Sequence, residues 1–190
     1  MNHNLFVIFF VNCTKIESMI KINEKEYPVK VSEMTLEQWT NVSNAIQVFK
    51  DDALLQFEAV LKALGVPEKE CDTLPISFMN ELYPQLEDVA DDYELTETID
   101  RYTLTLPDVF TVKEAKMIDR LAVEFGNHTV ALLAFFYRDQ SLTLTEHTDK
   151  AHIKHKMQLF KPMPAKDFVY AVGAIMEYLT KEIKSLQSEG

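Results

Sequence analysis

The chain has 190 residues and is 47% hydrophobic, so it can bury a sizeable core in one domain or in two small subdomains that share a core. Its net charge is −11, from 30 acidic and 19 basic residues, which disfavours general binding to the phosphate backbone of nucleic acids. It has four glycines, which disfavours a sheet-rich fold and a glycine-rich phosphate-binding loop.

The N-terminal segment, residues 1–18, contains seven consecutive apolar residues at 5–11, far fewer than the ~20 that span a bilayer. Met19 stands directly before a well-patterned strand at 20–22. We therefore interpret residues 1–18 as a non-native or disordered extension. A weak export signal and an extra buried strand are the alternatives.

Residues 19–86 are predicted to form a hairpin followed by helices. Apolar residues alternate with polar ones at 20–22 and 27–31, on either side of a polar turn at 23–26, which indicates two short antiparallel strands. Helical spacing of apolar residues then predicts helices at 36–49, 52–64 and 73–86.

The boundaries of these helices carry recognisable signals. Thr35 and Gln38 have the spacing of a capping box, in which each side chain accepts a hydrogen bond from a free backbone N–H. Gly65 and Pro67 follow the second helix in the order typical of a helix C-terminus.

Residues 87–100 hold seven carboxylates and no basic residue, and are interpreted as an acidic linker because like charges at this density resist packing. Residues 101–190 are predicted to form a strand at 102–106 and then helices. Thr111 and Glu114 repeat the capping box and open a helix that ends at Gly126.

The C-terminal third is predicted to be helical. Residues 130–137 are almost wholly apolar and should be buried on most sides, whereas 149–160 are expected to form a polar helix. A long helix then runs to about residue 186. The fold class that follows is α+β and predominantly helical, with a small antiparallel sheet packed against a helical bundle. Residues 101–190 can share one core with 19–86.

Three histidines form the one group with potential to bind a metal. His152 and His155 are three residues apart on an expected helix, which lets both face one metal ion of the zinc type, and His147 precedes them. The interpretation that we favour is a solvated basic face, because ammonium groups this close would oppose a divalent cation. The lysines that interleave with the histidines are Lys150, Lys154 and Lys156.

Motifs of catalysis are missing from the sequence. It has no Gly-x-Ser-x-Gly nucleophile elbow and no Gly-rich nucleotide-binding motif. The acidic segment at 87–100 is expected to be exposed, so its carboxylates are poorly suited to general acid–base catalysis. We therefore expect no enzyme activity, no cofactor and no metal.

Apolar helix surface is the feature that points to binding. Leu36 and Trp39 lie on the apolar face of the first helix, and the last helix carries one apolar stripe. We expect each of these two groups of residues to form either core or a contact face for a protein partner. The residues of that stripe are Phe168, Val172, Ile175, Met176, Leu179 and Ile183.

Four stretches carry a resemblance to known proteins: residues 20–29 (IKINEKEYPV), 34–39 (MTLEQW), 132–138 (LLAFFYR) and 157–164 (MQLFKPMP), the last followed by the closing apolar helix. In these stretches the chain resembles small proteins that tailed phages encode among their tail and virion-assembly genes. The polar insert at 139–150 departs from that pattern.

The resemblance implies a tail-assembly chaperone, acting in the cytoplasm of the infected host, or a minor structural subunit retained in the virion tail or baseplate. Its partners would be other phage tail proteins, such as a tape-measure or tail-tube protein, with no nucleic acid and no membrane, and a homo-oligomer is allowed. The alternatives of another class are a metal-dependent enzyme that uses His147, His152 and His155, and a DNA-binding regulator, which the net charge disfavours.

Overall fold

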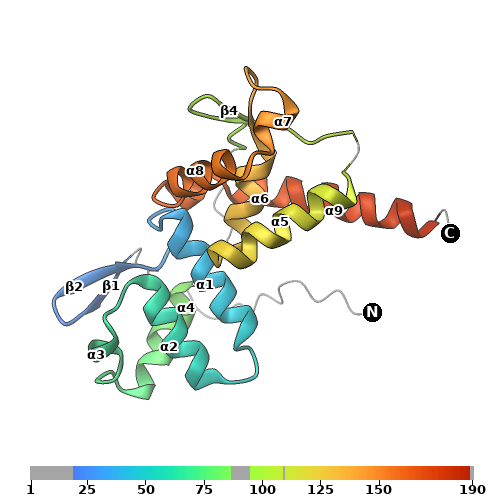
Figure 1. The fold of residues 1–190 in the computed structure, drawn as a ribbon. Coiled ribbons are helices and arrows are strands. Elements are labelled where there is room, and N and C mark those ends of the chain that lie inside the picture. The colour runs from blue at the N-terminus through green and yellow to red at the C-terminus, as the bar shows by residue number, and fades with distance from the viewer. Residues whose placement is uncertain (1–18, 87–94, 109, 189–190) are drawn as a thin grey trace.

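The structure is a computed structural model, and it describes residues 19–86, 95–108 and 110–188. Figure 1 shows the N-terminal elements, β1 to α4, gathered at one end and the C-terminal elements, α5 to α9, at the other. The expectation of a predominantly helical α+β fold is confirmed, with the strands in small antiparallel sheets. The expected extension at 1–18 lies outside the described residues.

The hairpin consists of β1 (Met19–Ile22) and β2 (Lys25–Pro28), paired so that Ile22 lies opposite Lys25. Its turn is therefore the two residues Asn23 and Glu24, which both have positive φ angles of 46° and 69°. A two-residue turn of this kind matches the right-handed twist of the strands. The predicted four-residue turn at 23–26 is wrong, because Lys25 and Glu26 belong to the second strand.

The N-terminal helices pack on this hairpin around one hydrophobic cluster (Figure 1). Their bounds are α1 (Leu36–Val48), α2 (Ala53–Leu64), α3 (Glu68–Cys71) and α4 (Met79–Leu86), the last preceded by a 3-10 turn at Ile76–Phe78. The predicted helices at 36–49 and 52–64 are confirmed. Gly65 ends α2 with a φ of 96°, a left-handed conformation that suits glycine.

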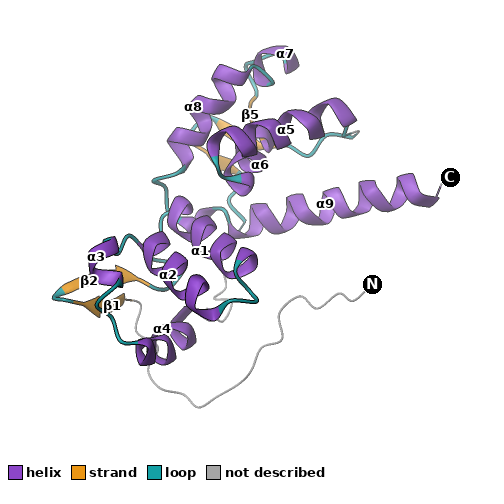
Figure 2. Ribbon diagram, turned by 60° about the horizontal axis from the view of Figure 1, so that its bottom comes forward, coloured by secondary structure: helices purple, strands orange, loops and turns teal. Residues whose placement is uncertain are grey.

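The C-terminal elements enclose a second hydrophobic cluster beside a three-stranded antiparallel sheet (Figure 2). The strands are β3 (Thr98–Ile99), β4 (Tyr102–Leu104) and β5 (Tyr137–Asp139). The helices are α5 (Val112–Phe125), α6 (His128–Phe136), α7 (Leu144–His147), α8 (Lys150–Phe160) and α9 (Val169–Ser188).

Two features of this half differ from the sequence interpretation. Residues 98 and 99 pair with β4 and bury Ile99, so the acidic linker predicted at 87–100 does not extend through them, and residues 87–94 lie outside the described parts. Tyr137, expected at the end of a helix, instead begins β5, where it pairs with Leu104.

The two halves are joined where α1 begins. The backbone N–H groups of Leu36 and Glu37 donate to the carbonyls of Met163 (2.7 Å) and Lys161 (3.0 Å) in the segment that leads to α9. These hydrogen bonds satisfy two of the N–H groups that a helix N-terminus leaves free. Leu36 thus packs in the C-terminal cluster and Ala165 in the N-terminal one, so the halves interlock.

Candidate functional site

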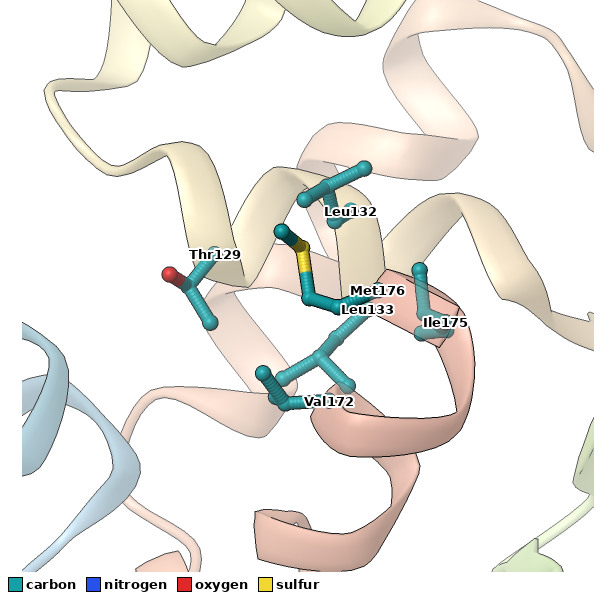
Figure 3. A pocket seen from close by; sticks show the side chains of 6 residues that line it. All are labelled: Thr129, Leu132, Leu133, Val172, Ile175 and Met176. Carbon is teal, nitrogen blue, oxygen red and sulfur yellow. The ribbon is translucent and has the colours of Figure 1, made fainter. Parts of the chain in front are cut away.

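An apolar notch lies between α6 and α9, and we call it the α6–α9 notch (Figure 3). Its lining residues are Thr129, Leu132, Leu133, Val172, Ile175 and Met176. The notch has a volume of about 30 Å³, room for roughly one methyl group or one water molecule. Such a depression can seat the tip of an apolar side chain but cannot enclose a small-molecule substrate.

The α9 helix places the predicted stripe in two different environments. Phe168 and Ile175 are fully buried in the C-terminal cluster. Val172 and Leu179 are half-buried, and Met176 is 51% exposed at the rim of the notch. Phe168 and Ile175 are therefore core residues, whereas Met176, with Val172 and Leu179 beside it, is accessible to a partner. The side chain of Ile183 lies outside what the structure describes.

Figures 1 and 2 agree that the C-terminal turns of α9 extend beyond the other helices. The start of α9 packs against α6 and against the 3-10 turn Ala165–Asp167. The helix is thus anchored along its N-terminal half, which contributes Val172, Ile175 and Met176 to the notch, and its C-terminal turns project.

The predicted contact residues of α1 occupy the junction between the halves. Leu36 is fully buried, so it belongs to the core. Trp39 is half-buried and packs against both hydrophobic clusters. Its indole therefore holds the two halves together and leaves part of its surface exposed.

A second depression, the α5 groove, runs along one face of α5 and encloses about 1120 Å³. The first turn of α5 and one face of the rest of the helix line it, and two more lining residues come from the turn before α8 and from the first residue of α8. The lining residues are Thr111, Val112, Lys113, Glu114, Lys116, Met117, Arg120, Leu121, Glu124, Thr148 and Lys150.

The charged residues of the α5 groove differ in whether they already have a hydrogen-bond or ion-pair partner. Glu114 accepts hydrogen bonds from the N–H and hydroxyl of Thr111 in the capping box, and Glu124 pairs with Lys150 at 2.5 Å. The exposed bases of α5 are Lys113, Lys116 and Arg120, and within the described parts of the chain none of these three forms an ion pair.

Of the three histidines that we considered as metal ligands, two lie together and the third lies apart from them. The rings of His147 and His152 meet edge to face with centroids 5.9 Å apart, whereas His155 is exposed on α8. Across the described residues, no group of three or more histidine, cysteine or acidic side chains has the geometry to hold a metal ion.

The solvated basic face expected at 147–156 is wrong for two of its members. His147 is buried, and Lys156 is 0% exposed, with its Nζ donating to the carbonyl oxygen of Tyr137 at 2.9 Å. The same Nζ lies 5.6 Å from the centre of the Tyr102 ring. Because Tyr102 and Tyr137 lie in neighbouring strands, Lys156 fastens α8 to the sheet. Lys150 and Lys154 are exposed, as expected.

The groups around Lys156 form a polar cluster, which we define as Tyr102, Asp139, His147, His152 and Lys156, and which is buried except for the half-buried His152. Burial lowers the pKa of Lys156 to about 7, with the charge of Arg138 acting in the same direction. Burial also lowers the pKa of His147 to about 4, helped by the charge of Lys156. At neutral pH the His147 imidazole is therefore uncharged.

Asp139 supplies the negative charge of this cluster. One carboxylate oxygen accepts hydrogen bonds from the N–H and hydroxyl of Ser141, at 3.0 and 2.6 Å, and the other pairs with Arg101 at 3.2 Å. The Ser141 hydrogen bonds, with the charge of Arg101 contributing less, hold the pKa of Asp139 below its usual value. No member of the cluster lines the α6–α9 notch or the α5 groove.

Sequence reasoning missed Lys156 although a signal was present. Ile153, Met157 and Phe160 are the buried residues of α8, and Lys156 falls on the same helix face. A lysine at a core position indicates either a partner for its charge or a lowered pKa. Asp139 and the α5 groove gave no comparable signal, because both arise from contacts between distant segments.

Comparison of the chain with models of protein families, with curated proteins and with solved structures found no match. In the described parts of the chain, no helix is both long and apolar enough to cross a membrane.

Proposed function

We propose that the protein binds another protein without catalysing a reaction, and that it serves phage tail assembly as a tail-assembly chaperone in the cytoplasm of the infected host. The observation that carries the proposal is the half-exposed Met176, which α9 presents at the rim of the α6–α9 notch, in the half of the helix that packs against α6. The sequence resemblance in residues 20–29, 34–39, 132–138 and 157–164 supplies the biological setting.

The chemistry of this surface suits an apolar helix of a partner. Met176 is flexible and polarisable, so it can adjust to partner side chains of different shape. The half-buried Val172 and Leu132 flank it, and the notch accepts the tip of one further apolar side chain. A partner helix would use residues three or four positions apart to make these contacts.

The acidic composition supports a chaperone role in particular. A chaperone has to cover apolar surface on its client and keep the complex in solution. A net charge of −11 on 190 residues gives the bound complex a repulsive surface that opposes aggregation.

Co-expression with the tape-measure protein of the same phage tests this proposal. The native chain should keep the tape-measure protein in the soluble fraction, and Met176→Asp should lose that effect because a carboxylate cannot be buried against an apolar helix without a large desolvation cost. Val48→Asp is the matched control, since Val48 is 62% exposed on α1. Equal solubility with Met176→Asp and Val48→Asp would contradict a role for this surface.

The composition of purified virions separates a chaperone from a structural subunit. We expect the chain to be abundant in the infected cell and missing from the finished particle. A stoichiometric band in purified tails would replace the chaperone proposal with that of a structural component.

A further inference from the structure

We propose that the α5 groove is a second docking surface that takes an acidic amphipathic helix of a partner protein. This inference rests on the proposed function, because it concerns the same non-catalytic binding activity. It names a separate surface and the chemistry of the segment that this surface receives.

The length of the groove matches a helix. The lining residues of α5 run from Val112 to Glu124, which spans about 18 Å at a rise of 1.5 Å per residue. A partner helix of about three to four turns covers that distance. The apolar part of the groove contains Met117, which is half-buried, and Val112, which is 68% exposed. Those side chains provide the surface on which an apolar helix face packs.

The charges of the groove select the partner. Lys113, Lys116 and Arg120 are exposed along the groove and form no ion pair within the described residues, whereas both acidic side chains already have partners in Thr111 and Lys150. The groove therefore carries a surplus of positive charge, although the net charge of the whole molecule is −11. Such a local patch attracts a segment of opposite sign and repels a basic one.

The probe for this inference is a side-chain-stapled amphipathic peptide of about 14 residues, with leucines on one face and glutamates beside them. Its counterpart has lysine in place of every glutamate. Fluorescence anisotropy with the full chain measures the binding of each. We expect the acidic peptide to bind at least tenfold more tightly than the basic one, and the difference to shrink as salt rises from about 50 to 300 mM.

Two triple variants locate the binding surface. Lys113→Glu, Lys116→Glu and Arg120→Glu together should weaken binding of the acidic peptide at least tenfold and should strengthen binding of the basic peptide. The matched control reverses three exposed lysines of other elements and produces the same change in net charge. These control positions are Lys21, Lys69 and Lys166.

Three outcomes would overturn the inference: equal affinity for the two peptides, equal effects of the two triple variants, or a dimer in sedimentation velocity that the groove variant dissociates. The last would assign the groove to a second copy of this chain. Met176→Asp should bind the acidic peptide as the native chain does. A failed peptide assay therefore removes the groove inference and leaves the solubility test of the α6–α9 notch intact.

Discussion

Lys156→Met should stabilise the protein at and below neutral pH, because it removes an amino group buried with no solvent exposure while keeping a side chain of similar length. The pKa of Lys156 falls from 10.5 to about 7 in the folded chain. Each pKa unit corresponds to about 1.36 kcal/mol, so protonated Lys156 lowers the free energy of unfolding by about 5 kcal/mol. Methionine removes that cost but leaves the Tyr137 carbonyl without its donor, which costs about 1–3 kcal/mol.

The pH dependence separates this effect from ordinary repacking. Since the folded pKa lies below the unfolded one, the unfolded chain binds more protons between pH 7 and 10.5. The stability of the native protein therefore rises with pH in this window and is lost as pH falls toward 7. From pH 6.5 to 9 the native chain should gain about 2 to 3 kcal/mol relative to Lys156→Met.

Urea unfolding of both proteins at pH 6.5, 7.5, 8.5 and 9 measures this difference. Groups that titrate in both proteins cancel when the two are subtracted. Lys154→Met, at an exposed position of α8, is the matched control and should run parallel to the native chain. A difference in stability between the native protein and Lys156→Met that stays constant with pH would show that the pKa of Lys156 is not lowered by folding.

Three further predictions concern a buried histidine and two helix-capping residues. The pKa of His147 is lowered to about 4 against an ordinary value of 6.5, so the native chain loses stability as pH falls from 6.5 to 4. His147→Gln should reduce that loss in urea titrations. Unchanged acid sensitivity of this variant would contradict burial of an uncharged imidazole. Asn127 caps α6 and donates to Thr40 Oγ1 at 2.6 Å, a hydrogen bond that links the two halves. Asn127→Ala should therefore lower the free energy of unfolding by about 2 kcal/mol. A loss under about 0.5 kcal/mol would be inconsistent with a buried hydrogen bond between the halves. Thr111→Ala removes the capping box of α5 and should cost about 1 kcal/mol in the same assay, whereas Thr111→Ser should retain most of it.

The helices of this protein could be predicted because their signals are local. Thr35 with Gln38, and Thr111 with Glu114, form the capping boxes that their spacing predicts, and Gly126 adopts the left-handed conformation that ends α5. Each of these interactions lies within four residues of the chain. Both partners of each of these contacts therefore lie in one short stretch of sequence, where their spacing can be recognised.

The three-stranded sheet could not be predicted, because its pairing depends on distant segments. Tyr137 follows an apolar run with helical character and leaves the helix to pair with Leu104, more than thirty positions earlier. Ile99 lies next to an acidic segment but is buried by pairing with Tyr102. In both places, tertiary contacts override the local pattern.

The candidate site was predicted in part. The α9 stripe contains the accessible Met176, yet periodicity cannot tell which residues of a stripe another helix covers, and packing against α6 makes Ile175 core. The α5 groove requires the start of α8 to lie beside the end of α5, as the Lys150–Glu124 ion pair shows. That proximity has no signature in either segment alone.

Site-specific photo-crosslinking in infected cells tests whether the protein binds a partner through its exposed apolar helix surface. A photoreactive phenylalanine (p-benzoylphenylalanine) would replace Met176 in one variant and Val48 in another, and mass spectrometry would identify the linked proteins. We expect one dominant crosslink from position 176 to a phage tail protein, and no such product from position 48. No product at 176, or the same scattered host proteins from both positions, would contradict that expectation.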